Sequence, residues 1–578
     1  MLSLNKKKWN LANPSSDDCL KLMKEAFVSM LVAKLLVNRN IISGQEATYI
    51  LDSDLSNLHD PFLMKGMNIA VDRILKAIKD NEILTVFADY DVDGVSSAAF
   101  LIHFFQDLGI SIRYYLPNRM VEGYGLTTGA LNFIKETGSS LIITADCGIT
   151  AVKEVTLAKK MGLDVIITDH HQVSSEGLPE ALAVLNPHQP ECFYPFRFLC
   201  GVGIVAKLST AIRTALYRSG WEKSRLPNLR QYLDLFALGT IADLAPLTGE
   251  NHVLTRHGLK ELTTTQKPGL IALKSVAGLN GTVDSQSIGF RLGPRLNAAG
   301  RLGKADSGLH LLISKDLTQA NELADELEIM NRERQEVQKW TQKEVEYLIS
   351  KEVDLGNDRV IVLASENFHR GVVGIVASRI VERFYRPVIL IAINNGFGSG
   401  SGRSINKFNL FKGLQECSNY FQQFGGHAFA AGLTLEVSKI DGFKRNFKEI
   451  GRKFLSEDDL IPEVNVDCEV KLADVSFELI DEINKLSPFG AVNPMPVFIT
   501  RNVILRNIKF IGKDMNHVRF KALQGNVLKD VIAFNMQSVF ANNLKNGDQV
   551  DIVFQATVNE WHGKENIQLK LVDIVFLA

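Results

Sequence analysis

The stretch FADYDVDG, residues 87–94, lies at the end of the apolar run EILTVF and is followed by the helix-like segment SSAAFLIHFF. Its three carboxylates, Asp89, Asp91 and Asp93, occupy alternate positions and repel one another when all are ionised. A bound metal cation would remove this repulsion. A solvated acidic turn is the alternative interpretation. The stretch therefore predicts a metal site after a strand, provided that other parts of the chain supply further ligands.

Two further apolar runs, SSLIIT and LDVIIT, end in the same way. Asp146 follows the first run in ADCG, and the triplet DHH, residues 169–171, follows the second. Helix-like stretches separate the runs, which is the βαβ pattern of a parallel sheet covered on both faces. Because ligands bind outside the carboxyl ends of strands in such sheets, we expect the clusters to converge in one crevice. For DHH alone, a helix N-cap with a satisfied histidine pair is the alternative.

Asp243, in the apolar stretch LGTIADLAPL, is a fourth candidate, because an unpaired carboxylate in apolar surroundings is costly. Carboxylate oxygens suit Mg²⁺ and Ca²⁺, and an added histidine moves the preference toward Mn²⁺. Four carboxylates would overcharge one divalent ion, whereas two ions with a bridging carboxylate balance the charge. Two such ions about 3.5–4 Å apart are typical of phosphate-ester hydrolysis. The candidate ligands are Asp91, Asp93, Asp146, His170 and Asp243.

The composition is that of a globular protein without a membrane span. The chain has 578 residues, of which 46% are hydrophobic and 22% charged. This length predicts roughly three or four domains, because single cores rarely exceed about 250–300 residues. No window has the roughly 18 consecutive apolar residues of a span, and the opening MLSLNKKKWNLANP lacks the apolar core of a secretion signal. We therefore expect a cytoplasmic protein with no membrane segment.

Cysteine spacing and net charge exclude several other classes of protein. The six cysteines are scattered without a CxxC pair, so neither a disulfide framework nor a thiolate zinc site is indicated. The formal net charge of -1 argues against binding of a polyanion by the whole surface. A local basic channel remains compatible with this balance.

The chain divides into five segments by pattern. Residues 1–66 are expected to be helical, and residues 67–308 hold the parallel sheet. Residues 309–355 contain neither glycine nor proline and predict one long helix, on the order of 50 Å at about 1.5 Å per residue. The apolar positions that suggest this helix are Leu323, Leu327, Met330, Val337 and Trp340.

Beyond the long helix, residues 356–458 return to an α/β rhythm with RVIVLASENF and PVILIAIN. Residues 459–578 change to alternating strands separated by turn signals such as LQGN and NGDQ. The clearest strand is VDIVFQATVNEW, in which every second residue from Val550 to Val558 is apolar. We predict a small antiparallel barrel there, of OB type.

Several of these stretches together resemble a known family. FADYDVDG, ITADCGI, ITDHH and GTIADLAPL, in this order, are similar to the signature motifs of the DHH phosphoesterase superfamily. LPNRMVEGYGL, GFRLGPRLNAAGRLGKAD, FHRGVVGIVASRI, GSGRS and FGGHAFAAG are similar to those of its RecJ single-strand exonuclease branch. The resemblance spans almost the whole chain. It implies an α/β fold in which a DHH domain, a long helix, a DHH-associated domain and an OB-like barrel follow one another.

The resemblance also implies an activity. Relatives of this branch would act as 5′→3′ exonucleases that are specific for single-stranded DNA and release 5′-mononucleotides with two Mn²⁺ or Mg²⁺ ions. They would serve DNA repair and recombination. The implied partners are single-stranded DNA with a free 5′ end, a helicase and a single-strand-binding protein, and the enzyme would be a monomer.

Carried over by motif, the resemblance makes Asp91, Asp93, Asp146, His170 and Asp243 metal ligands, with Asp146 as the bridge. His171 would lie beside the scissile phosphate. Asp89 is a further metal candidate, because relatives in other branches use a histidine upstream of the DxD pair and Phe87 stands at that position here. Asp89 would either replace that ligand or support the others.

The remaining implied residues would bind substrate. Ser401, Arg403 and Arg119 would form a pocket for the 5′-phosphate, and Gly400 and Gly402 would let the backbone form an anion nest. The basic stretch around residue 295 has a cation density that suits DNA phosphates, and the family motif FGGHAFAAG would contact phosphate through its histidine. The candidates from these two stretches are Arg295, Asn297, Arg301 and His427.

Each substrate candidate has a simpler interpretation. GSGRS could be a flexible loop with an incidental arginine, the stretch around residue 295 an ordinary solvated basic loop, and His427 a buried, hydrogen-bonded side chain. Two other functions compete with the exonuclease. One is a DHH enzyme for cyclic dinucleotides, short oligonucleotides or pAp, and the other is a non-catalytic scaffold that has lost its metals.

Overall fold

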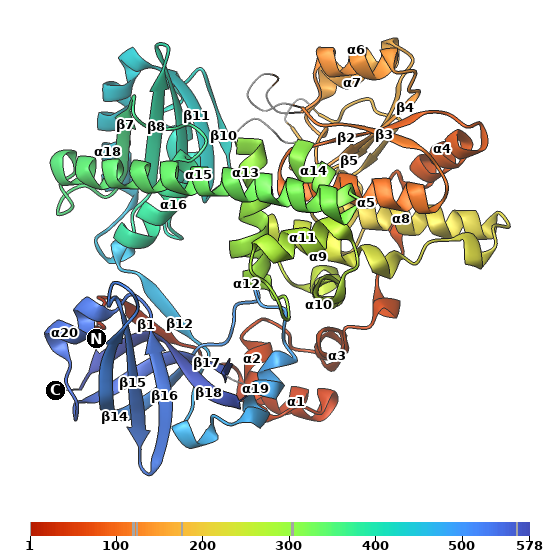
Figure 1. Ribbon diagram of the computed structural model, residues 1–578. Helices are drawn as coiled ribbons and strands as arrows, with labels where there is room; N and C mark the ends of the chain where they lie inside the picture. Colours follow the sequence, from red (N-terminus) through yellow and green to blue (C-terminus); the bar gives the residue numbers. More distant parts are fainter. Residues whose placement is uncertain are drawn as a thin grey trace. The chain divides into compact units, whose positions relative to one another are not determined.

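The computed structural model describes residues 2–117, 122, 125–174, 177–301, 306–561 and 564–577 (Figure 1). The chain forms two compact units, and each combines distant parts of the sequence. We call Pro14–Asn331 with Asp481–Met495 the large unit. The small unit consists of Met1–Asn13, Arg332–Ile480 and Pro496–Ala578. Within the described residues, no helix is both long and apolar enough to cross a membrane.

The large unit contains the predicted parallel sheet, in the order β3-β2-β4-β5-β6. All its pairings are parallel. The three central strands are the predicted apolar runs, and they are almost entirely buried because helices cover both faces. The strands are β2 (Leu84–Ala88), β3 (Ile112–Tyr115), β4 (Leu141–Ala145), β5 (Asp164–Thr168) and β6 (Ala183–Leu185).

Helix α5 (Val92–Asp107) forms the centre of the large unit's core. Phe100, Phe104 and Phe105 are each at most 1% exposed, and the helix packs against α8 (Gly201–Arg218) and α9 (Leu233–Ala242). The other long helices of this region surround the sheet and these three helices. They are α4 (Met67–Lys79), α6 (Thr128–Glu136), α7 (Val152–Lys160), α10 (Gly249–Thr264), α11 (Pro268–Val276), α13 (Gly293–Arg301) and α14 (Asp306–Ile313).

The start of the chain is only partly helical, in contrast to the prediction for residues 1–66. Helices α1 (Ser16–Ala26), α2 (Met30–Val37) and α3 (Gly44–Asp52) each begin after a serine whose hydroxyl accepts a backbone hydrogen bond. Residues Lys8–Leu11 instead form strand β1, which pairs in parallel with β12 (Glu463–Val466) of the small unit. The helical prediction fails there because a strand pairing between such distant residues leaves no local signal.

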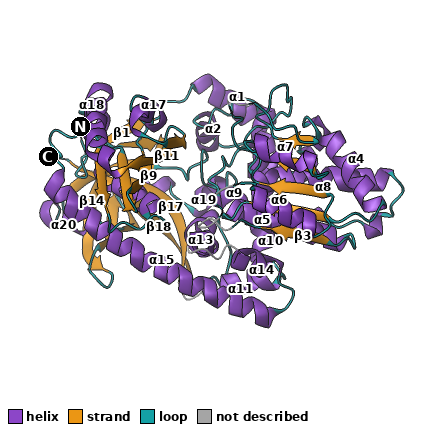
Figure 2. Cartoon of the chain, turned by 90° about the horizontal axis from the view of Figure 1, so that it is seen from above, coloured by secondary structure: helices purple, strands orange, loops and turns teal. Residues whose placement is uncertain are grey.

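The long helix, α15 (Leu317–Glu352), is shorter than the predicted 309–355 and is continuous in Figure 2. Residues Ser314–Asp316 separate it from α14, and the Asp316 carboxylate accepts a hydrogen bond from the Gln319 amide at 2.8 Å, which caps the first turn. Leu327 on this helix is buried, as predicted, whereas Trp340 is 50% exposed. The helix has 36 residues and therefore spans about 54 Å.

The small unit carries a mixed sheet and a barrel. The sheet has the order β10-β11-β9-β8-β7, in which only β7 and β8 are parallel. Helices α16 (Val373–Phe384) and α18 (Ile440–Phe454) pack their apolar residues against it. The strands are β7 (Ile361–Ser365), β8 (Val388–Asn394), β9 (Phe397–Arg403), β10 (Gln423–Gly426) and β11 (Ala430–Glu436).

The C-terminal strands form a closed barrel, which agrees with the predicted OB-like fold, but β16 and β18 pair in parallel, so the barrel is not wholly antiparallel as predicted. They pair in the order β14-β15-β16-β18-β17, and β17 returns to β14. On barrel strand β18, the buried Asp573 accepts hydrogen bonds from Trp9 Nε1 and Asn5 Nδ2, both at 2.7 Å. The barrel strands are β14 (Phe498–Ile511), β15 (His517–Gln524), β16 (Val527–Ala533), β17 (Gln549–Trp561) and β18 (Lys564–Phe576).

Candidate metal centre

The FADYDVDG turn joins β2 to α5 and presents its carboxylates at the carboxyl edge of the sheet. Asp91 is the N-cap of α5, and its Oδ1 accepts a hydrogen bond from the Gly94 amide at 3.0 Å. A Cβ on Gly94 would lie 2.4 Å from the backbone oxygen of Asp89, so only glycine fits this tight turn. The local sequence therefore sets the spacing of the acidic residues.

The other acidic and imidazole groups reach the same edge from β4, β5 and α9. Asp146 follows β4, is 1% exposed and has a φ of 62°, a left-handed conformation that is uncommon outside glycine. His170 and His171 follow β5, and Asp243 is the C-cap residue of α9. A Cβ on Gly201 would lie 2.5 Å from Asp146 Cβ, so α8 approaches Asp146 closely because its first residue has no side chain.

These groups converge, as the sequence predicts. Nε2 of His170 lies 3.1 Å from Asp146 Oδ1, 3.8 Å from Asp243 Oδ2 and 4.0 Å from Asp93 Oδ2. Asp89, Asp91 and Asp146 form an adjoining cluster whose possible ligand atoms all lie within 4.8 Å of one another. The structure thus gathers Asp89, Asp91, Asp93, Asp146, His170, His171 and Asp243 at one sheet edge.

The support of Asp93 was not predicted from the sequence. Its two carboxylate oxygens accept hydrogen bonds from the amides of Gly201, at 2.6 Å, and Val202, at 3.0 Å, which are the first residues of α8. A helix N-terminus stabilises a nearby anion. The start of α8 therefore holds the Asp93 carboxylate without a positively charged side chain. The small residues of LCGVGIV were the only sequence signal for this close approach.

Asp169 is a second residue whose role was missed. It is 1% exposed, and its Oδ1 lies 2.7 Å from Nδ1 of His171, while its Oδ2 accepts a hydrogen bond from the Ile149 amide. Burial alone would lower the pKa of His171, but the hydrogen bond and charge of Asp169 outweigh burial and raise this pKa to about 9. His171 is therefore a cation at neutral pH, oriented by Asp169.

Burial and neighbouring negative charges make ionisation of the clustered carboxylates unfavourable. Burial and then the charge of Asp91 raise the pKa of Asp93 to about 7, and burial and then Asp93 raise the pKa of Asp243 to about 8. The pKa of Asp146 is also raised, first by burial and then by Asp93. Burial, followed by the charge of His171, lowers the pKa of His170 to about 4, which leaves its imidazole neutral and able to coordinate a metal.

This donor set fits divalent cations. Asp146 Oδ1 and His170 Nε2 are both buried and have no hydrogen-bond partner, although a buried polar atom without a partner costs about 1–3 kcal/mol. Several carboxylate oxygens with one neutral imidazole nitrogen match the ligands of Mn²⁺ and Mg²⁺. The set exceeds the needs of one divalent ion, so the residues fit the predicted pair of ions.

We expect metal binding to stabilise the protein more at pH 8 than at pH 6. The pKa values of Asp93 and Asp243 are raised on folding, so without metal their stability contribution is lost as the pH rises through about 7 and 8. A cation must displace these protons. As the pH is lowered below these pKa values, the affinity for the cation should therefore fall roughly tenfold per pH unit for each proton released. Calorimetric titration of Mn²⁺ in two buffers with different ionisation enthalpies measures this release. Binding with no proton release would contradict the assignment.

The phosphate-binding candidates Ser401 and Arg403 lie together on β9 of the small unit, next to the start of α16. Arg403 Nη1 donates to Ser401 Oγ at 3.2 Å, and a Cβ on Gly374 would lie 2.9 Å from that Oγ. The predicted anion nest is wrong, because β9 is an extended strand. A Cβ on Gly400 would clash with Leu433, and one on Gly402 with Leu410, so close packing explains these glycines.

The other substrate candidates have different surroundings. His427 lies in the turn between β10 and β11 and is exposed, which contradicts the alternative of a buried histidine. Arg295 Nε lies 2.8 Å from Glu328 Oε2, and Asn297 is half-buried on α13, so their stretch is helical and is not a solvated loop. Arg119 lies outside the described residues, as does the side chain of Arg301.

Comparison with known proteins agrees with this geometry. Residues 83–240 match the DHH family, N-terminal domain, residues 357–453 the DHHA1 domain, and residues 466–573 the RecJ OB domain. The single-stranded-DNA-specific exonuclease RecJ of Bacillus subtilis is 40% identical over 573 residues, which cover 98% of this chain and 71% of the relative. The chain belongs to the RecJ family of single-stranded-DNA-specific exonucleases.

Solved RecJ structures share the fold. RecJ from Thermus thermophilus in complex with Mn²⁺ superposes with a TM-score of 0.83 at 27% identity, covering 99% of this chain and 80% of that one. The same RecJ in complex with Mg²⁺ gives a TM-score of 0.77 at 25% identity, covering 99% and 79%. These RecJ crystals held the two cations that the donor set here favours.

Proposed function

We propose that this protein is a metal-dependent 5′→3′ exonuclease that hydrolyses single-stranded DNA to 5′-mononucleotides in repair and recombination. The observation that supports it best is the gathering of acidic groups and His170 from β2, β4, β5 and α9 at one sheet edge. The relatives in its family are named single-stranded-DNA-specific exonucleases. We assign as metal ligands Asp91, Asp93, Asp146, His170 and Asp243. Asp89 is a further proposed ligand, because it lies beside Asp91 and Asp146.

The chemistry follows from the arrangement of the side chains. Two divalent cations, Mn²⁺ or Mg²⁺, supply a nucleophile at neutral pH and offset the charge that develops on the phosphate. Asp146 would bridge them, because its carboxylate belongs to two of the three groups of possible ligands, one with His170 and His171 and one with Asp89 and Asp91. His171, held as a cation by Asp169, is placed to donate a hydrogen bond to a phosphoryl oxygen.

The direction of digestion requires recognition of the 5′ end. We assign this to Ser401 and Arg403, with Arg119 as the third predicted member. Burial lowers the pKa of Arg403, yet the group stays charged, and it lies beside the N-terminal turn of α16, next to Gly374. An arginine, a hydroxyl and a helix N-terminus together favour a phosphate. His427, Arg295, Asn297 and Arg301 are proposed to contact further phosphates.

The barrel offers a surface for the rest of the strand. On its outer face Arg506 lies opposite Lys521, and Lys509 lies opposite Arg519, on β14 and β15. Asp530 on β16 lies opposite Lys521 and 3.4 Å from Arg519 Nη2, so it offsets part of the repulsion between these cations. Like charges opposite each other destabilise a sheet, and a polyanion would relieve the repulsion that remains. We further propose that the protein is a cytoplasmic monomer that works with a helicase and a single-strand-binding protein, because it requires unpaired strands.

The decisive experiment is a time course with Mn²⁺ on single-stranded DNA that carries a 5′-phosphate and a label at each end. We expect the 5′ label to be released as a mononucleotide from the first time points, while the 3′ label stays in shortening fragments. Duplex DNA and pAp serve as parallel substrates. Efficient hydrolysis of pAp with intact DNA would favour a small-substrate enzyme, and no hydrolysis at all would favour a scaffold.

Binding to single-stranded DNA should depend steeply on salt. With about six phosphate contacts, the affinity should fall on the order of 10²-fold between about 50 and 200 mM salt. Fluorescence anisotropy with a labelled oligonucleotide and without divalent cation measures this slope. In the double variant Arg506→Ala/Arg519→Ala, the affinity should fall less steeply with salt. A wild-type affinity that does not change with salt would refute the cationic surface.

A further inference from the structure

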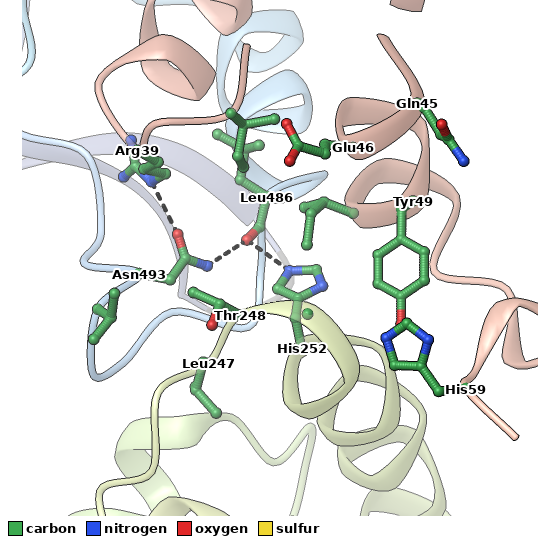
Figure 3. Close-up of a pocket in the computed structure, with 14 residues that line it drawn as sticks. Arg39, Gln45, Glu46, Tyr49, His59, Leu247, Thr248, His252, Leu486 and Asn493 are labelled. Carbon is green, nitrogen blue, oxygen red and sulfur yellow. Dashed lines mark hydrogen bonds between the residues drawn. The ribbon is translucent and has the colours of Figure 1, made fainter. Parts of the chain in front are cut away.

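The large unit contains a pocket that the proposed reaction does not use. It encloses about 430 Å³ and opens between helix α3, the start of α10 and the segment Asp481–Met495 (Figure 3). This volume lies within the range of small-molecule sites, about 300–1,000 Å³. Its apolar walls come from Ile41, Ile50, Leu247, Leu486 and Val492.

Hydrogen bonds between two of these segments, the start of α10 with the loop before it and Asp481–Met495, fix one side of this pocket before any ligand arrives. The Leu486 carbonyl accepts from His252 Nε2 at 3.1 Å and from Asn493 Nδ2 at 2.9 Å, as the dashed lines in Figure 3 show. The amide of Leu247 donates to the Ala491 carbonyl at 2.9 Å. Binding would therefore require little ordering of the protein on this side of the pocket, so the entropy cost of binding would be small.

The charged groups of the lining are already committed. Arg39 donates to Asn493 Oδ1 through Nε and to the carbonyls of Leu35 and Pro494 through its other nitrogens. At the rim, the Glu46 carboxylate accepts a hydrogen bond from the Ser43 hydroxyl at 3.0 Å. The three hydrogen bonds of Arg39 hold the wall in place, so a phosphate would have to compete with them. The Ser43 hydroxyl does not neutralise the Glu46 carboxylate, which would repel a phosphate at the rim. Both features argue against a nucleotide or a DNA phosphate.

Two buried polar atoms of the lining have no hydrogen-bond partner among the described residues, Tyr49 Oη and His252 Nδ1. A hydroxyl can donate or accept, so Tyr49 sets no requirement on the ligand, whereas His252 does. His252 is 1% exposed, and because its Nε2 must donate to the Leu486 carbonyl, its Nδ1 carries a lone pair. Nδ1 is buried without a hydrogen-bond partner. In Figure 3 this edge of the ring is turned away from Leu486, toward the side where Tyr49 and His59 lie. A ligand that brings an N–H or O–H donor would satisfy it.

The mouth of the pocket is shaped by an unusual residue. Val492 is β-branched, yet its φ is 64°, and its side chain is 66% exposed. Such a conformation is costly for a β-branched residue and persists only where the surroundings impose it. It leaves an apolar side chain at the rim, and the aromatic rings of Tyr49 and His59 lie across the pocket in Figure 3. Flat rings of this kind pack well against another aromatic ring.

We propose that this pocket is a second ligand site, which binds an uncharged small molecule with an aromatic ring and one N–H or O–H donor. The site is separate from the metal centre, and it does not depend on the proposed nuclease function. Leu247 and Thr248 of its wall follow Asp243 closely in the chain, so the ligand would contact the loop that carries a metal ligand.

Two probes of equal shape test the donor. Indole carries an N–H, and benzofuran has an oxygen in its place. By titration of the full-length protein with ligand-observed NMR, indole should saturate with a Kd on the order of 0.1–1 mM, and benzofuran should bind about fivefold or more weakly. Equal affinities would overturn the donor assignment, and no saturable indole binding up to about 5 mM would overturn the site. Displacement of indole by dAMP at equal concentration would overturn the proposal that the ligand is uncharged.

Variants at the rim locate the site. Val492→Trp places an indole ring of the protein in the mouth of the pocket and should abolish indole binding. Val437→Trp, at another exposed valine in the small unit, is the matched control and should bind indole as the wild type does. Cooperative thermal unfolding confirms that each variant is folded. If Val492→Trp does not fold, Gln45→Trp on the exposed face of α3 repeats the test. Unchanged indole binding in a folded rim variant would refute the proposal.

Discussion

Replacement of His170 or Asp91 by alanine should lower the rate of nucleotide release from single-stranded DNA at least about 10³-fold. Both residues reach the shared sheet edge, where His170 Nε2 lies 3.1 Å from Asp146 Oδ1. Loss of one ligand leaves the remaining donors unable to hold a pair of cations, and the reaction then loses both its nucleophile and its charge compensation. Release of labelled mononucleotide at saturating Mn²⁺ measures the effect.

The same variants should retain their fold and most of their affinity for DNA, because the phosphate contacts proposed here lie elsewhere. Asp164→Ala is the matched control. Asp164 is the first residue of β5, the strand whose other end leads into DHH, and it pairs with Arg73 at 2.6 Å. Its loss should change turnover by no more than a few fold. Activity within tenfold of the wild type in either His170→Ala or Asp91→Ala would refute the ligand assignment.

Arg403→Ala should strongly reduce discrimination between 5′-phosphorylated and 5′-hydroxyl DNA. Charge-assisted hydrogen bonds contribute about 1.5–3 kcal/mol each, so turnover of the phosphorylated substrate at low concentration should fall roughly 10–150-fold. The hydroxyl substrate should be almost unaffected. The ratio of kcat/KM for the two substrates is the measurement, and in this variant it should fall toward one, with Ser401 and Arg119 keeping the remaining discrimination.

Two further variants make this test specific. Arg403→Lys keeps the charge but loses the planar fork, and it should restore only part of the discrimination. Arg445→Ala removes an exposed arginine from α18 of the same unit and should leave the ratio unchanged. A wild-type ratio in Arg403→Ala would show that another part of the chain recognises the 5′ end.

Local patterns predicted most of the metal centre. Each of its strands is an apolar run followed at once by a polar group, and parallel strands bring their carboxyl ends to one edge. Asp243 is not on this sheet, and its apolar setting was the signal that identified it. The assignment of Asp89 gains support from its cluster with Asp91 and Asp146.

Residues that act through others were harder to predict. Asp169 orients His171 from two positions away, but the letters DHH do not show which of these side chains supports another. The amides of Gly201 and Val202 hold Asp93 across more than 100 positions, which no local spacing predicts. The glycines of GSGRS led to the wrong prediction of an anion nest, because close packing and a nest both require glycine. The environment alone distinguishes these two reasons for a glycine.

The sequence by itself determined the α/β class, the long helix, the barrel and the ligand chemistry, because periodicity and residue type act over a few neighbouring positions. Only the tertiary structure decided which distant segments meet. Strand β1 joins β12, and Asp481–Met495 packs in the large unit, where it forms a wall of the second pocket. Such contacts are stabilised by burial and by hydrogen bonds between residues hundreds of positions apart, and no local pattern records them.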